Sequence, residues 1–172
     1  MDEIWAIVLA AGASTRMKTQ KLLLPFNGKT IIETVIQNVA LSVKTNIMVV
    51  LGSHRYEISR LIGQMPVKYC VNTDFINGML SSVICGFRAL PEYATAALIF
   101  LGDQPQISGT VAKKVIEAWR ESKKGIIIPT FNGRRGHPSL IATKYIAEIE
   151  KLDHERGLRS LFIRFEEDIY IV

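Results

Sequence analysis

Short, continuous apolar runs recur along this 172-residue chain, and they constrain its fold more than any other feature. The runs have strand length and show no alternation with polar residues, a pattern typical of strands buried on both faces. They are Ile4–Ala10, Ile47–Leu51, Val67–Val71, Ala96–Leu101 and Ile126–Ile128. The chain is therefore predicted to build a sheet whose two faces are covered.

Segments with helical periodicity separate these runs. The clearest is Ile31–Val43, where Thr30 followed by Glu33 fits a capping box at the start of a helix. Its apolar stripe is predicted to be Ile32, Val35, Ile36, Val39 and Val43. Further helices are expected over Tyr56–Ile62, over Ser82–Ala89 and after Ser108, the last one burying Val111, Val115, Ile116 and Trp119. Alternating strands and helices predict an α/β protein with three layers, α/β/α, around a mostly parallel sheet.

The alternation of predicted strands and helices ends after Pro129, and Thr130–Arg135 is polar and rich in turn residues. A strand is expected over Pro138–Ala142, and short helices near Tyr145 and Leu158. No internal repeat or Gly/Ser linker divides the chain, so residues 1–172 are expected to form a single domain, in which this last part is α+β in character.

Composition and cysteine usage exclude several classes of protein. Apolar residues make up 48% and charged residues 22%, a globular balance, and no apolar run reaches the roughly 18 to 20 residues of a membrane helix. The acidic start Met1-Asp2-Glu3 is unlike a signal peptide, which predicts a cytoplasmic protein. Cys70 and Cys85 lack CxxC spacing and are expected to be reduced thiols in the core.

The formal charge of +5 and pI of about 9.3 favour an anionic partner. The basic residues are spread along the chain, and the densest runs, Lys123-Lys124 and Arg134-Arg135, are only pairs. Aromatic residues do not interleave with them as stacking platforms for nucleic acid would. Nucleic acid is therefore a distant candidate, and no membrane partner is expected.

The first expected strand leads into a loop rich in small residues, Leu9–Met17, followed by Lys21. Small residues let backbone N–H groups approach an anion, while Arg16 and Lys21 add positive charge. This pattern predicts a phosphate-binding loop at the carboxyl edge of the sheet, although an ordinary strand-to-helix turn is the alternative. It is not a GxGxxG fingerprint, and Gly28-Lys29-Thr30 is no Walker A loop because Leu23 stands where the first glycine is required.

The strand predicted at Ala96–Leu101 leads into Gly102-Asp103-Gln104-Pro105, which places a carboxylate at the same edge. Mg²⁺ is usually held by one or two carboxylates together with substrate phosphates, so Asp103 is the candidate magnesium ligand. An aspartate that only caps the next turn is the alternative.

Several segments together resemble the MobA/MocA-like nucleotidyltransferases, and most closely their cytidylyl branch. They are Leu9-Ala10-Ala11-Gly12 with Ser14, Arg16, Met17 and Lys21; Asn77–Val83; Gly102–Pro105; Gly136-His137-Pro138; and Glu155-Arg156-Gly157-Leu158-Arg159. They follow one another in the family's order and cover nearly the whole chain. The resemblance implies the Rossmann-like, mixed but mostly parallel sheet of the nucleotide-diphospho-sugar (GT-A-like) transferases.

The resemblance also implies a reaction, in which CMP passes from CTP to molybdopterin-bound molybdenum and pyrophosphate leaves. Arg16, Lys21 and Asp103 would be catalytic, with Asp103 on Mg²⁺, and His137, Arg156 and Arg159 would face the anionic acceptor. The implied nucleotide-binding residues are Leu9, Ala10, Ala11, Gly12, Ser14, Arg16, Lys21, Gly78, Ser81, Ser82 and Asp103. For Gly78 and Ser82, a loop end and a helix cap are the structural alternatives, and for Arg156 and Arg159 the alternative is a solvated basic surface. A molybdenum hydroxylase of purine catabolism, such as xanthine dehydrogenase, is the implied recipient enzyme.

The sequence departs from that family in two places. Lys18 stands where the family usually has glycine, and the chain stops in a predicted strand, Ile169–Val172, before the family's acidic closing segment. A truncation, a partner chain that completes the site, or nucleotide binding without efficient transfer would each account for the second departure. Asp168 comes too early to replace the missing carboxylate.

Two other functions remain open from the sequence. One is a related nucleotidyltransferase that uses GTP with molybdopterin, or a nucleotide with a sugar phosphate. The other is a nucleotide- or cofactor-binding protein with weak catalysis, which delivers cofactor to a molybdenum hydroxylase. Base selectivity distinguishes the first, because a mismatched base leaves buried polar groups unsatisfied, and the absence of pyrophosphate release distinguishes the second.

Overall fold

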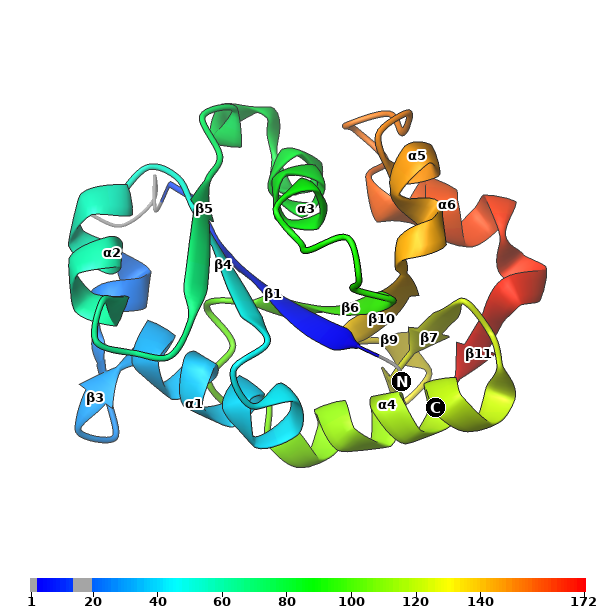
Figure 1. The fold of residues 1–172 in the computed structure, drawn as a ribbon, viewed down its shortest axis with the longest axis horizontal. Coiled ribbons are helices and arrows are strands. Elements are labelled where there is room, and N and C mark those ends of the chain that lie inside the picture. The colour runs from blue at the N-terminus through cyan, green and yellow to red at the C-terminus, as the bar shows by residue number, and fades with distance from the viewer. Residues whose placement is uncertain (1–2, 14–19) are drawn as a thin grey trace.

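A mixed seven-stranded sheet forms the middle layer of the protein (Figure 1). The structure is a computed structural model, and it describes residues 3–13 and 20–172. Its strands, in spatial order, are β11 (Ile169–Ile171), β7 (Ile126–Ile128), β10 (Ser139–Ala142), β6 (Ala96–Leu101), β1 (Ile4–Ala10), β4 (Ile47–Leu51) and β5 (Lys68–Val71). β10 runs antiparallel to both its neighbours, and the other neighbouring pairs are parallel. The predicted mostly parallel sheet is confirmed.

Helices cover both faces of this sheet, so the predicted three layers are also confirmed (Figure 1). One face carries α1 (Ile31–Val43), α2 (Arg55–Ile62) and α4 (Gly109–Ser122), and the other carries α3 (Met79–Arg88), α5 (Ile146–Ile149) and α6 (Leu158–Arg164). Short 3₁₀ helices lie at Lys21–Leu23 (η1), Phe75–Asn77 (η2), Thr143–Tyr145 (η3) and Glu166–Asp168 (η4). Two hairpins pair β2 (Pro25–Phe26) with β3 (Lys29–Thr30), and β8 (Thr130–Phe131) with β9 (Arg134–Arg135).

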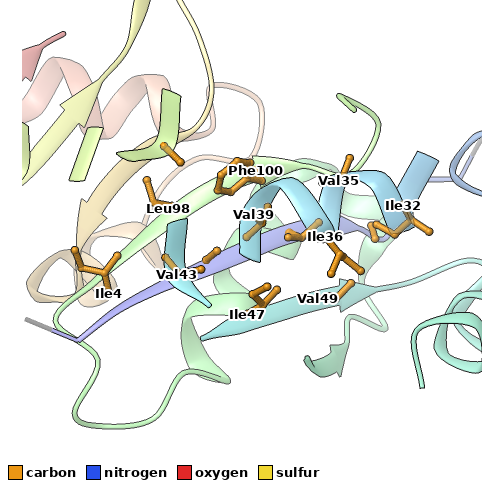
Figure 2. Packing of buried hydrophobic residues seen from close by; sticks show 14 of the residues in the cluster. Ile4, Ile32, Val35, Ile36, Val39, Val43, Ile47, Val49, Leu98 and Phe100 are labelled. Atoms are coloured by element: carbon orange, nitrogen blue, oxygen red, sulfur yellow. The ribbon is translucent and has the colours of Figure 1, made fainter. Parts of the chain in front are cut away.

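The central strand β1 sends alternate side chains into two cores. Ala6 and Val8 join the cluster under α1, α2 and α4, whereas Ile7 joins the cluster under α3, α5 and α6. Figure 2 shows the predicted stripe of α1 packed over Ile47, Val49, Leu98 and Phe100. Each fully buried large aliphatic side chain stabilises the fold by roughly 1.5–3 kcal/mol, so this packing fixes the sheet that carries the site.

The predicted capping box starts α1. The Thr30 hydroxyl accepts a hydrogen bond from the Glu33 backbone N–H at 3.3 Å, and the Glu33 carboxylate accepts one from the Thr30 N–H at 2.8 Å. The Thr30 hydroxyl also donates to the Glu33 carboxylate at 2.7 Å. This bond, followed by the one from the Thr30 N–H, lowers the pKa of Glu33.

Four details differ from the sequence-based predictions. β5 is an edge strand with mostly exposed residues, so it is not buried on both faces. α3 begins at Met79, three residues before the predicted start, because Gly78 occupies the N-cap position. In α4 the alanines Ala112 and Ala118 are buried, while Val111 and Trp119 are only half-buried. Both cysteines are free thiols as expected, but half-buried.

Across the described part of the chain, the helices all lack the length and apolar content that crossing a bilayer requires.

Candidate active site

The carboxyl ends of β1, β4 and β6 meet at one edge of the sheet, and the predicted phosphate-binding loop starts there. The Gly102 N–H donates to the Leu9 carbonyl at 2.9 Å, and a Cβ at Gly102 would lie 2.7 Å from the same oxygen. Glycine is therefore required for this close approach of the β6 end to β1. From the β4 side, the Ser53 hydroxyl donates to the Gly12 carbonyl at 3.2 Å.

The residues of this loop fall into two groups. Leu9, Ala10, Ala11 and Gly12 lie at the carboxyl edge as predicted, and Gly12 is exposed with open space where a side chain would be. Ser14 and Arg16 lie outside the described residues, as does Lys18.

The structure brings Lys21 and Asp103 together, although 82 residues separate them in the sequence. The Lys21 Nζ lies 3.1 Å from the Asp103 Oδ2, and both side chains are nearly half exposed. Lys21 begins η1, and Asp103 follows β6. A cation and a carboxylate therefore lie side by side at the edge where the predicted phosphate-binding loop starts. Both are accessible to solvent.

The predicted base-binding residues form a closed hydrogen-bond network. Asn72, directly after β5, donates from its amide to the Ser81 hydroxyl at 2.9 Å and to the Ser82 hydroxyl at 3.0 Å. Ser81 also bonds the Gly78 carbonyl at 2.8 Å and the Asp74 carbonyl at 3.0 Å. Both serines are buried, so their hydroxyls hold the loop in shape, and neither caps α3.

Gly78, in contrast, is exposed and has a φ of 88°, in the left-handed region that favours glycine. It ends the 3₁₀ turn η2, where its N–H donates to the Phe75 carbonyl. The backbone around Gly78 is therefore the accessible part of the predicted base-binding loop, and the bonds among Asn72, Ser81 and Ser82 fix its shape.

A cavity of about 1000 Å³ lies between α3, α6 and the β8–β9 hairpin. His137, Arg156 and Arg159, which were predicted to face the acceptor, all line it. Sequence reasoning missed four further lining residues, Arg134, Arg135, Ser139 and His154. Four arginines and a single acidic side chain, Glu155, therefore surround this cavity, which fits an anionic ligand.

His137 lies at the wall of this cavity and within the electrostatic influence of Asp103. Its Nδ1 lies 3.2 Å from the Ile99 carbonyl oxygen, which can only accept, so Nδ1 carries a proton. Burial lowers the pKa of His137, and this effect outweighs the Ile99 carbonyl and the negative charge of Asp103, which both raise it. The ring is therefore neutral at pH 7, which leaves Nε2 as an acceptor.

Ser139 lies on β10, two residues after His137, at the wall of the same cavity. Its side chain is 3% exposed, and its Oγ has no hydrogen-bond partner in the structure. Buried hydroxyls are nearly always paired, so the Ser139 hydroxyl is an exception within the described residues.

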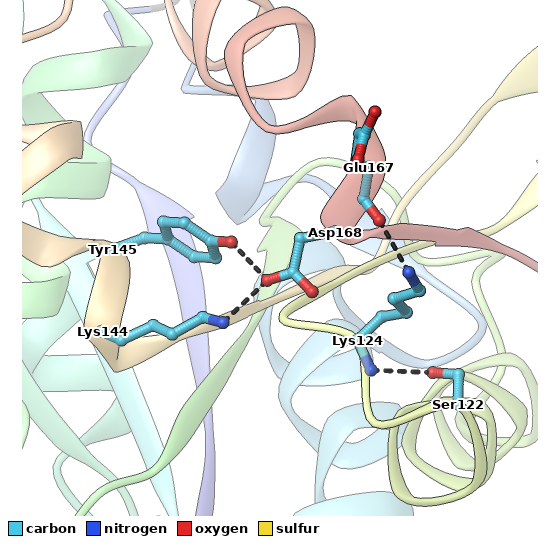
Figure 3. A network of polar contacts seen from close by, with 6 residues as sticks. All are labelled: Ser122, Lys124, Lys144, Tyr145, Glu167 and Asp168. Atoms are coloured by element: carbon cyan, nitrogen blue, oxygen red, sulfur yellow. Dashed lines mark hydrogen bonds and ion pairs between the residues drawn. The ribbon is translucent and has the colours of Figure 1, made fainter.

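Asp168 has a structural role, as expected from its position (Figure 3). Its carboxylate accepts hydrogen bonds from Lys144 Nζ at 2.7 Å and from the Tyr145 hydroxyl, fixing η4 and β11 to η3. Those bonds lower the pKa of Asp168 despite the opposing effect of desolvation, while burial raises the pKa of Tyr145.

Within residues 3–13 and 20–172, no three His, Cys, Asp or Glu side chains gather closely enough to hold a metal ion. Asp103 fits a magnesium site in another way, because Mg²⁺ takes one or two carboxylates plus phosphate oxygens from a bound nucleotide. Its carboxylate is accessible and lies at the sheet edge where the predicted phosphate-binding loop starts.

Comparison with known proteins identifies the class of enzyme. Residues 6–168 match the family model for the MobA-like NTP transferase domain. The chain belongs to this family, and it is a nucleotidyltransferase-family enzyme.

Three curated proteins are similar to this chain. The chain is 33% identical to the molybdenum cofactor cytidylyltransferase of Escherichia coli K12, in an alignment that covers 95% of this chain and 82% of the relative. It is 28% identical to nicotine blue oxidoreductase of Paenarthrobacter nicotinovorans, over 80% and 70%. It is 31% identical to a probable molybdenum cofactor guanylyltransferase of Natranaerobius thermophilus, over 77% and 62%.

Solved structures share the fold. Rv0371c of Mycobacterium tuberculosis H37Rv superposes with a TM-score of 0.86 at 22% identity, over 99% of this chain and 87% of that one. A second structure of Rv0371c is a complex with manganese, with a TM-score of 0.83 at 20% identity over the same shares. The 4-diphosphocytidyl-2C-methyl-D-erythritol synthase of Anaerococcus prevotii gives 0.77 at 18% identity, over 99% and 86%. The predicted nucleotidyltransferase fold is confirmed.

Proposed function

We propose that this enzyme transfers CMP from CTP to the terminal phosphate of a molybdopterin-type cofactor and releases pyrophosphate. The observation that carries the proposal is that His137 lines a cavity together with four arginines and is also affected by the charge of Asp103, which pairs with Lys21. That arrangement offers a place for a triphosphate and a separate place for a second anionic substrate. The 33% identity to a molybdenum cofactor cytidylyltransferase over 95% of the chain supports this choice of substrates.

In this proposal, exposed backbone at Gly12 and the positive charge of Lys21 bind the triphosphate, while Gly78 contacts the base and Ser81 and Ser82 hold the base loop. Ser14 and Arg16 are proposed to complete the phosphate site. His137, Arg156 and Arg159, joined by Arg134 and Arg135, are proposed to hold the acceptor through its phosphate.

The acceptor phosphate is already anionic, so no general base is needed for it to attack. One of its oxygens forms a bond to the α-phosphorus of CTP, the bond from that phosphorus to the β-phosphate oxygen breaks, and pyrophosphate leaves. Catalysis then depends on alignment and on neutralising the charge that develops, which is the proposed role of Lys21. Asp103 is proposed to hold Mg²⁺, which would supply further positive charge to the triphosphate.

The test is pyrophosphate release with molybdenum-loaded molybdopterin, Mg²⁺ and either CTP or GTP. The expected result is release with CTP that falls at least about a hundredfold in Asp103→Ala. Glu121→Ala, which removes a carboxylate from the exposed surface of α4, is the matched control and is expected to match the wild type. Release with GTP alone would instead assign the guanylyl reaction of the Natranaerobius relative. Release with neither nucleotide from folded protein would contradict transfer and leave a binding or delivery role.

A further inference from the structure

The two cysteines of the chain lie in contact, although 15 residues separate them. The Cys85 Sγ lies 3.5 Å from the Cys70 Sγ, and the Cys70 Sγ also lies 3.8 Å from the Cys85 carbonyl oxygen. Cys70 belongs to the edge strand β5 and Cys85 to α3, and both are half-buried. Neither thiol is part of the proposed transfer site.

The contact makes the two thiols unequal. The hydrogen bond from Cys70 to the Cys85 thiolate lowers the pKa of Cys85 to about 7, against desolvation and Asp74, with help from the positive charge of Arg88. The same bond and burial raise the pKa of Cys70. Because the thiolate is the reactive form, Cys85 is suited to attack first and Cys70 to attack second.

The two cysteines lie on the two elements that flank the predicted base-binding loop. Cys70 precedes Asn72 by two residues, and Cys85 follows Ser81 and Ser82 by about one helical turn. The Asn72 bonds to those serines already connect β5 with α3. A disulfide between the cysteines would connect the same two elements covalently and close the loop that carries Gly78.

We propose that Cys70 and Cys85 form a thiol-modification site that reacts with small-molecule disulfides, such as oxidised glutathione, to give an intramolecular disulfide that orders the base-binding loop. The Cys85 thiolate attacks one glutathione sulfur, which forms a mixed disulfide and releases one glutathione thiolate. Cys70 then loses its proton to solvent and attacks the Cys85 sulfur, releasing the second glutathione. Two protein thiols are oxidised and one glutathione disulfide is reduced to two glutathiones.

The direct test is mass spectrometry of the whole protein after incubation with oxidised glutathione at pH 7.5. The wild type is expected to lose two hydrogen atoms and both titratable thiols, and dithiothreitol is expected to reverse this. Cys70→Ser is expected to stop at the mixed disulfide on Cys85, and Cys85→Ser to react at least about tenfold more slowly, since the attacking thiolate is gone. Two stable glutathione adducts, a disulfide between two chains, or no reaction would overturn the proposal.

A second measurement tests the effect on the loop. Because the bond closes a loop of about 15 residues, the oxidised protein is expected to melt about 5 °C or more above the reduced one. Amide hydrogen exchange over residues 72–81 is expected to slow at least about threefold, while exchange in α4 stays the same. Unchanged melting and exchange in an oxidised sample would show that the bond does not order the loop.

The link to the substrate rests on the proposed function, because it assumes that this loop binds the base. A loop ordered in advance loses less entropy on binding, so the Kd for CTP is expected to fall about threefold on oxidation. An unchanged Kd, together with a formed disulfide, would overturn only this link. Absent CTP binding in both redox forms would instead contradict the proposed function and leave the modification site standing.

Discussion

Lys21 and Asp103 are the pair of side chains on which the proposed chemistry depends most. Their charges lie 3.1 Å apart and both are nearly half exposed, so bound phosphate can compete with Asp103 for the ammonium group. Lys21→Ala is expected to lower kcat/KM for pyrophosphate release at least about a hundredfold, which corresponds to about 2.7 kcal/mol of transition-state stabilisation. The melting temperature should change little, because an exposed ion pair contributes little to stability.

The control for this substitution is Lys113→Ala, which removes an exposed lysine from α4. It is expected to keep the wild-type kcat/KM. If Lys21→Ala also kept at least a third of that value, Lys21 would have no part in the transfer step.

A second prediction concerns Ser139, whose buried hydroxyl has no partner among residues 3–13 and 20–172. Ser139→Ala is expected to leave the free energy of unfolding unchanged or to raise it by up to about 1 kcal/mol, since an unpaired buried hydroxyl costs stability. The KM values for the acceptor and for CTP are expected to stay within about twofold of the wild type, because the buried Oγ is not exposed to the cavity. A loss of stability would show that the hydroxyl has a structural partner instead.

These residues differ in how far the sequence reveals them. Asp103 and Lys21 follow recognisable local signals, a strand end and a loop of small residues, and parallel strands necessarily bring such ends to one edge. Arg134, Arg135 and Ser139 carry no such signal, because the β8–β9 hairpin and the antiparallel β10 bring them to α6 only in the folded chain. The arginine pair was visible in the sequence, but its cavity was not.

The capping box at α1 gives a prediction about an element. Thr30→Ala removes the hydroxyl that accepts from the Glu33 N–H and donates to the Glu33 carboxylate. The free energy of unfolding is expected to fall by about 1 kcal/mol, measured by urea denaturation. Thr110→Ala, at an exposed position in the first turn of α4, is the control and should not destabilise. A loss below about 0.3 kcal/mol for Thr30→Ala would mean that tertiary packing alone holds this end of α1.

Local signals predicted some element boundaries better than others. The predicted start of α1 is correct, because side chains cap this helix. α3 starts earlier than predicted, because a glycine with positive φ stands at its N-cap. The exposure of β5 was missed for a different reason. The run Val67–Val71 was interpreted as apolar although it contains Lys68, and lysine is typical of edge strands. The sheet order shows that β5 has one neighbour.

For the molecule as a whole, the shifted pKa values predict how stability depends on pH. The pKa of His137 is lower in the folded protein than its usual 6.5, so the unfolded chain binds more protons just below that value. The contribution of neutral His137 to stability is therefore fully present above about pH 6.5. It is lost as the pH falls toward the folded pKa of His137. The pKa of Asp168 is also lowered, from 3.8, so a second loss follows as the pH falls from about 4 through its folded pKa.

Urea denaturation between pH 8 and pH 3 measures both steps. Each group can contribute a slope of up to about 1.4 kcal/mol per pH unit within its own window. His137→Gln is expected to flatten the curve between about pH 6.5 and 5 only, because the uncharged amide does not titrate, while Asp168→Asn is expected to flatten it below about pH 4 only. Glu33, whose pKa is also lowered, keeps part of the acid slope in both variants. A wild-type curve that is flat between pH 6.5 and 5 would mean that protonated His137 is accommodated in the folded protein, since Asp103 and the Ile99 carbonyl would then compensate for its burial.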